Sequence, residues 1–127
     1  MELKKVIDLN SKNISPKNCF VSTTFCEDGI SLSKVLKLCK DNNISALEIG
    51  SNHIYEDNYD YIKNYDFNFL VHNYFPVPKK SFVVNIASSD SKIRNRSIDH
   101  IKKSIDFSKS IDAKLYTFHP GFISDPV

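Results

Sequence analysis

Short apolar runs alternate along most of the chain with segments in which apolar residues recur at helical spacing. The apolar runs are rich in aromatic and β-branched residues, a composition typical of strands buried on both faces of a parallel sheet. We predict strands over residues 19–23, 46–50, 67–71 and 114–118, and helices over residues 32–43, 58–64 and a longer span that starts near Ser91. This alternation indicates right-handed βαβ units and therefore an α/β protein with a parallel sheet.

Both main predicted helices are amphipathic. Ser31 is a candidate N-cap for the first, in which apolar residues recur at helical spacing from Leu32 to Cys39. We expect one side of the long helix to be a solvent-exposed polar face rather than a phosphate site; it comprises Lys92, Asn95, Arg96, Asp99, Lys102, Lys103, Asp106 and Lys109. Small residues that would allow close packing against a sheet lie within its apolar side: Ser97, Ser104 and Ser108. His100 flanks that side and is predicted to be partly buried.

Polar residues stand where the predicted strands end. His72 and His119 each directly follow an apolar run. Thr23, Glu48 and His72 follow one another at nearly equal intervals, as a repeated βα unit would place them. Because the carboxyl ends of parallel strands meet at one edge of the sheet, the two imidazoles are expected to lie close together. Neutral imidazole is a common metal ligand, so the pair is a candidate metal site.

Composition and charge narrow the possible functions. The chain has 127 residues, 41% hydrophobic and 25% charged, as expected for one soluble globular domain. A net charge of +2 and only two arginines, Arg94 and Arg96, give little reason to expect a nucleic-acid partner or an anionic membrane surface. No G-x-G-x-x-G or P-loop motif occurs among the three glycines, which argues against nucleotide binding by a glycine-rich loop.

The cysteines and the absence of apolar spans point to a cytoplasmic protein without a membrane partner. The chain has three cysteines and no C-x-x-C pair, so we expect reduced thiols. Cys19 and Cys39 are predicted to be small core residues, whereas Cys26 lies in a loop, where a catalytic thiol is the less favoured interpretation. No secretory leader is evident in MELKK, and no apolar run approaches the roughly 18 residues that span a bilayer.

Two segments carry a resemblance to a known superfamily. LVHNYFPVP, followed by FVVNIASSDSKIRNRSIDHIKKSIDFSKSIDAKLYTFHPGF, resembles the xylose-isomerase-like barrel superfamily, particularly its sugar phosphate isomerase/epimerase branch. The same segments are similar to endonuclease IV, with a histidine strand end, an N-x-A-S loop and an FHPG strand end. The resemblance covers about residues 18–125. It implies a (β/α)8 TIM barrel, whose active site collects at the carboxyl ends of the strands.

The resemblance also implies roles for particular residues. His72 and His119 match the histidines that ligate zinc in endonuclease IV, so they are the candidate metal ligands; in the isomerase branch they would instead contact sugar hydroxyls or the reacting oxygen. Glu48, Asn73 and His53 are the candidates for substrate contact, with a buried structural carboxylate as the alternative for Glu48. Asn85 is a weaker candidate that could equally fix its own loop. The implied cofactor is a divalent metal ion: zinc, manganese or magnesium.

A barrel of this type needs about 250 residues. We therefore interpret residues 18–127 as the first half of a barrel, roughly four of its eight βα units, preceded by an N-terminal extension over residues 1–17. The proton-transferring catalytic residues are expected beyond Val127. Unpaired edge strands of a half barrel would also allow a homo-oligomer.

Three hypotheses about function follow. The first is the N-terminal part of a sugar or sugar phosphate isomerase/epimerase, acting by metal-assisted proton transfer next to a carbonyl. The second is an endonuclease IV-like, metal-dependent nuclease for abasic DNA. The third is an inactive barrel fragment that folds only by assembly.

Overall fold

The structure is a computed structural model that describes residues 19–125. The predicted extension over residues 1–17 lies outside this range. In chain order the elements are β1 (Val21–Ser22), the 3-10 turn η3 (Thr23–Phe25), α1 (Leu32–Asp41), β2 (Ala46–Ile49), the 3-10 turn η4 (Asp60–Asn64), β3 (Asn68–His72), α2 (Ser91–Ser110) and β4 (Leu115–Thr117). The predicted order of strands and main helices is confirmed.

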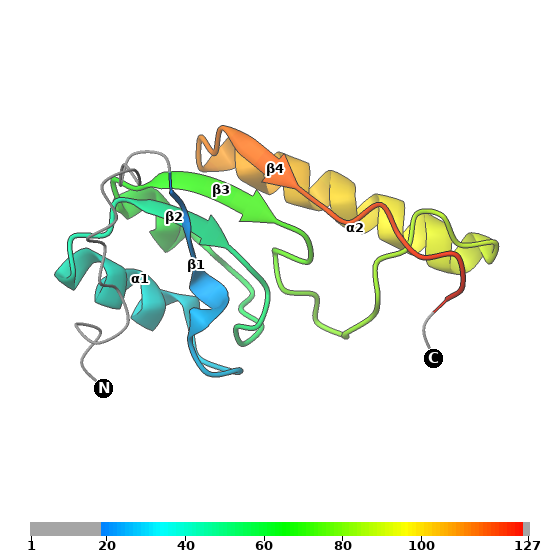
Figure 1. The fold of residues 1–127 in the computed structure, drawn as a ribbon, viewed down its shortest axis with the longest axis horizontal. Coiled ribbons are helices and arrows are strands. Elements are labelled where there is room, and N and C mark those ends of the chain that lie inside the picture. The colour runs from blue at the N-terminus through cyan, green and yellow to red at the C-terminus, as the bar shows by residue number, and fades with distance from the viewer. Residues whose placement is uncertain (1–18, 126–127) are drawn as a thin grey trace.

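The strands form one parallel sheet in the order β1-β2-β3-β4 (Figure 1). Each strand is joined to the next by a crossover through helical or loop segments, which is the arrangement of repeated βα units. In the register of the sheet, Ser22 is paired with Glu48, and His72 is paired with Thr117. Because paired residues of parallel strands share a face, these side chains are directed to the same side of the sheet.

The hydrophobic core lies on the opposite side of the sheet. Strand residues Leu47, Ile49 and Val71 are fully buried there, in alternation with Glu48 and Leu70 on the other face. The helices contribute the apolar stripe of α1 and the turn η4: Leu32, Val35, Leu36, Cys39 and Ile62. The sheet is thus covered on this face by α1 and η4, while α2 packs along β3 and β4 (Figure 1).

The serine stripe of α2 allows the close packing that its sequence predicts. Ser97, Ser104 and Ser108 are buried, and each hydroxyl donates to the backbone carbonyl four residues earlier at 2.7–3.0 Å. These bonds satisfy the hydroxyls inside the helix, so no other polar partner is needed at the packed surface. His100 is buried, as predicted, and the side chains of the polar face are exposed.

Three local details differ from the predictions. Cys19 is exposed rather than a core residue, because sheet pairing begins only at Val21. The helix predicted over 58–64 is the 3-10 turn η4, which opens with the Asp60 N–H donating to Asn58 Oδ1 at 2.6 Å. Ser31 does stand at the N-cap of α1, but its hydroxyl contacts the Ser33 hydroxyl at 3.2 Å and does not cap the helix.

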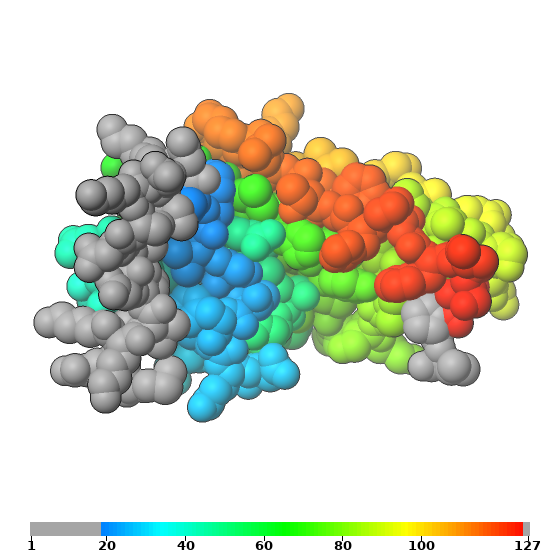
Figure 2. Space-filling model, in the orientation of Figure 1, coloured from blue at the N-terminus to red at the C-terminus, as the bar shows by residue number. Residues whose placement is uncertain are grey.

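Asn85 joins the segment after β4 to the loop before α2. Its Nδ2 donates to Asp125 Oδ1 at 2.8 Å and to the carbonyl of Phe122 at 3.2 Å, while its Oδ1 accepts from the N–H of Phe122 at 3.0 Å. Gly121 has a φ of 135°, and a Cβ there would collide with Asn85 Oδ1. Figure 2 shows the red C-terminal segment against the yellow-green residues of this loop. Asn85 therefore fixes its loop, as one of its two interpretations predicted.

Neither helix in residues 19–125 combines the length and the apolar character that crossing a membrane requires.

Candidate functional site at the carboxyl ends of the strands

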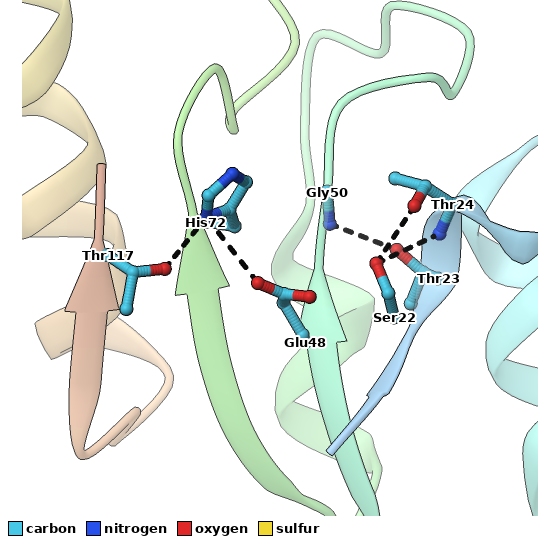
Figure 3. Close-up of polar contacts among 7 residues, drawn as sticks. All are labelled: Ser22, Thr23, Thr24, Glu48, Gly50, His72 and Thr117. Atoms are coloured by element: carbon cyan, nitrogen blue, oxygen red, sulfur yellow. Dashed lines mark hydrogen bonds and ion pairs between the residues drawn. The ribbon is translucent and has the colours of Figure 1, made fainter. Parts of the chain in front are cut away.

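Polar side chains from neighbouring strands meet where the strands end. Glu48 comes from β2, His72 is the last residue of β3, and Thr117 is the last residue of β4 (Figure 3). On the other side of β2, Ser22 is the last residue of β1, and its hydroxyl contacts the Thr24 hydroxyl at 2.9 Å. The parallel register brings these groups together, because it aligns the strand ends at one edge of the sheet.

His72 is held by both neighbouring strands. Its Nδ1 lies 2.8 Å from Thr117 Oγ1 and 3.4 Å from Glu48 Oε1. A carboxylate only accepts hydrogen bonds, so a proton on Nδ1 is the tautomer that serves both contacts. Nε2 then carries the free lone pair, and Figure 3 shows this second nitrogen pointing away from Glu48 and Thr117. His72 is thus oriented as a ligand or a hydrogen-bond acceptor.

His119 lies next to His72, as the strand ends predicted. The ring centroids are 5.3 Å apart, and the planes meet edge to face at 87°. His119 itself is exposed, and the side chains of His72 and Glu48 remain 31% and 28% exposed. The cluster is therefore accessible to a small molecule.

The other two candidates for substrate contact lie elsewhere. The side chain of Asn73 is 1% exposed, and neither of its polar atoms has a hydrogen-bond partner among residues 19–125. Its backbone N–H donates to the carbonyl of Thr117 at 2.9 Å and so extends the pairing of β3 with β4. His53 is 4% exposed. The structure brings Glu48, His72 and His119 together and does not add Asn73 or His53 to their accessible cluster.

His53 is part of a buried hydrogen-bond chain. Its Nδ1 lies 3.2 Å from the carbonyl of Ile30, which can only accept, so Nδ1 is the donor. Its Nε2 then accepts from the hydroxyl of Thr23 at 2.9 Å, and Thr23 Oγ1 accepts from the N–H of Gly50 at 3.0 Å. Burial lowers the pKa of His53 and so favours the neutral ring. The hydrogen bonds require this neutral form, because Nε2 must accept from Thr23 while Nδ1 donates to Ile30.

Thr117 was missed from the sequence. A threonine inside an apolar run is ordinary in a strand, so composition gave no reason to select it. Its spacing of two from His119 is a signal that was available, because alternate residues of a strand share a face. Its contact with His72, however, depends on the register between β3 and β4.

The donor set suits a divalent metal in part. Imidazole nitrogens suit zinc better than they suit magnesium or manganese, which prefer oxygen ligands. Residues 19–125 contain no group of three or more His, Cys, Asp or Glu side chains arranged to hold a metal ion. His72 and His119 would therefore supply two ligands, and a complete site would need a further ligand from outside the described residues.

Cys26 has the properties of a packed thiol. Burial, together with the nearby Glu27 carboxylate, raises the pKa of Cys26. A raised pKa reduces the thiolate fraction near neutral pH, whereas catalytic cysteines have lowered values. Burial raises the pKa of Cys39, on the core-facing side of α1, to about 11. These properties favour the non-catalytic interpretation of Cys26.

Comparison of the chain with protein-family models, with curated proteins and with solved structures found no match.

Proposed function

We propose that this edge of the sheet is part of the active site of a sugar or sugar phosphate isomerase/epimerase, built on a barrel of the xylose-isomerase-like type. Three features support the proposal: the repeated βα units, the parallel sheet and the clustering of polar side chains at the carboxyl ends of its strands. The remaining strands of the barrel would come from further sequence or from a second copy of the chain.

The observation that carries the proposal is the pair of imidazoles, with ring centroids 5.3 Å apart. His72 Nε2 and the ring of His119 would hold a divalent metal or contact the oxygens of a sugar directly. When bound, such an ion polarises a carbonyl oxygen of the substrate and stabilises negative charge that develops on it. Glu48, beside His72, would accept a hydrogen bond from a sugar hydroxyl.

The residues of this chain would mainly bind and orient the substrate. Thr117 and Glu48 fix the ring of His72, so its free nitrogen keeps one direction when the substrate arrives. Removal of a proton next to the carbonyl needs a carboxylate or other base with a suitable pKa. We expect that base on the strands that complete the barrel.

Solvent deuterium exchange tests this function. The full-length, metal-loaded protein should exchange deuterium into the carbon next to the carbonyl of an aldose, a ketose or a phosphate of either. His72→Ala and His119→Ala should abolish the exchange, whereas Lys102→Ala, on the exposed side of α2, should retain it. Absence of exchange with every sugar tried, in metal-loaded protein, would reject an isomerase or epimerase.

The same pair of histidines also supports a second candidate, an endonuclease IV-like nuclease for abasic DNA. Two imidazoles that hold a metal ion could activate water for attack on a phosphodiester. The near-neutral net charge of +2 makes this candidate the weaker one, because duplex-binding proteins usually carry a strong positive charge. Cleavage of an abasic duplex that is lost in His72→Ala, without any sugar exchange, would reverse this order.

A further inference from the structure

A groove lies between the polar face of α2 and the segment after β3. Its volume is about 750 Å³, within the range of small-molecule sites. Pro76, Val77 and Pro78 line one side, and Arg96 and Lys103 of α2 are among the residues that line the groove with them. None of the residues lining it belongs to the cluster of Glu48, His72 and His119. The segment leaves β3, turns away from the sheet and returns to the start of α2 (Figure 1).

The groove is strongly basic, although the chain as a whole is not. Its lining includes five cationic side chains, Lys79, Lys80, Lys92, Arg96 and Lys103, and a single carboxylate, Asp99. Within the part of the chain that the structure describes, none of the five forms an ion pair. Clustered like charges repel one another, and a bound anion would relieve that repulsion.

One of these cations is already held in position. The guanidinium of Arg96 lies over the ring of Phe82, at 3.9 Å from its centroid, and Nη2 donates to the carbonyl of Lys80 at 2.8 Å. The stacking and the hydrogen bond reduce the conformational freedom that Arg96 would lose on binding a ligand. A planar guanidinium fixed in this way suits the paired oxygens of a phosphate.

Aromatic and apolar surface accompanies the charges. Phe82 also contacts the ring of His100 edge to face, with centroids 5.5 Å apart, and Lys79 lies 5.9 Å from the ring centroid of Tyr55. His100 is buried, and burial lowers its pKa, so it provides packed neutral surface near neutral pH. The groove therefore offers flat apolar surface beside groups that bind phosphate.

We propose that this groove binds a small phosphorylated ligand that also carries a flat apolar group, as a nucleoside phosphate does. Arg96 and the surrounding lysines receive the phosphoryl groups, and the wall of Pro76, Val77 and Pro78, beside the Arg96–Phe82 pair, receives the flat group. Asp99 provides an acceptor for a hydroxyl or amino group of the ligand. Binding here is independent of the chemistry proposed for the strand ends, and no glycine-rich loop takes part in it. The proposal departs from the expectation from the sequence that the polar side of α2 is solely a solvent-exposed face, because the segment after β3 adds Lys79, Lys80 and an apolar wall opposite it.

Calorimetric titration of the full-length protein with ATP, inorganic pyrophosphate and adenosine tests the proposal. ATP should bind saturably and more tightly than pyrophosphate, and adenosine should bind weakly. Arg96→Gln should weaken ATP binding by about tenfold, as loss of a charge-assisted hydrogen bond does. Lys103→Gln should weaken it by a smaller factor. Lys102→Gln is the matched control, since Lys102 lies on the same exposed side of α2 but does not line the groove.

Four results would overturn the proposal as a whole, and two more would each reject one part of it. The four are no saturable binding of ATP at about 1 mM, full binding in Arg96→Gln, an equal loss in Lys102→Gln, or a loss in His72→Ala that places the ligand at the strand ends. Equal affinity for ATP and pyrophosphate would show that the groove does not recognise a flat apolar group. Much tighter binding of single-stranded DNA would show that its ligand is a nucleic acid rather than a small molecule. The Arg96, Lys102 and Lys103 variants should keep a thermal midpoint close to that of the wild type, because these side chains are exposed.

Discussion

The four histidines of the chain fall into two pairs that the structure treats in opposite ways. His72 and His119 stand at strand ends, accessible and close together, and Thr117 and Glu48 orient His72. His53 and His100 are 4% and 8% exposed and are packed inside the protein. All four side chains have the same chemistry. Only their surroundings distinguish the two that form a candidate site from the two that pack inside the protein.

The difference shows in the partners of the rings. Both nitrogens of His53 are used by protein atoms, Ile30 and Thr23, and nothing remains to offer to a ligand. His72 uses one nitrogen for orientation and leaves the other free. A fixed ring with one free nitrogen is the arrangement that a metal or substrate ligand needs.

The largest expected effect is on metal binding at the accessible pair. We expect His72→Ala to weaken zinc binding to the full-length protein by about 100-fold or more, because a direct ligand is lost. Competition titration with a zinc-binding dye measures the change. His53→Gln, measured under conditions in which circular dichroism shows it to be folded, is the matched control, since the His53 ring is not free to bind. An equal loss of zinc affinity in that folded variant would remove the distinction between the pairs.

Substitution of the buried pair, and not of the accessible pair, should change the stability of the fold. We expect His53→Ala to lower the free energy of unfolding by about 2–4 kcal/mol, since it removes one hydrogen-bond partner from both the Ile30 carbonyl and the Thr23 hydroxyl and opens a cavity. His119→Ala should change this free energy by less than about 0.5 kcal/mol, because the side chain is exposed. Urea titrations measure both variants. A similar destabilisation by the two substitutions would contradict the comparison.

A smaller effect should follow from loosening His72 without removing it. In Thr117→Val the ring loses its 2.8 Å contact but keeps Glu48, so zinc affinity should fall by about tenfold. The fold should survive, as valine suits a strand. Unchanged affinity in this variant would mean that Thr117 does not orient His72.

The smallest expected effect is a dependence of stability on pH that arises from the buried pair, His53 and His100. Burial lowers the pKa of both His53 and His100 below their ordinary value of 6.5, so the unfolded chain binds protons more readily than the folded chain. Their contribution is therefore complete above pH 6.5 and is lost as the pH falls towards the lowered values.

The dependence can be assigned by substitution. We expect the free energy of unfolding to fall as the pH drops below about 6.5, by less than about 1.4 kcal/mol per pH unit for each histidine. His53→Gln should show a smaller fall than the wild type, whereas His119→Gln should show the same fall. Equal pH dependence in all three proteins would exclude His53 as its source.

Much of the fold could be predicted from the sequence because its signals are local. The apolar runs and the helical spacing gave the order of the elements and placed the ends of β2, β3 and β4 within a few residues. The serines of α2 predicted its close packing for the same reason, since their spacing puts them on one side of the helix. Cys19 was misplaced because a strand pattern does not tell where pairing begins.

The site could be predicted only in part. That His72 and His119 would meet followed from their places at the ends of parallel strands, which a βα repeat aligns. That Thr117 would hold His72, that His53 would be enclosed, and that the loop after β3 would make a basic groove against α2 depended on contacts between distant segments. Such contacts depend on strand register and on packing, which the pattern of a single segment does not contain.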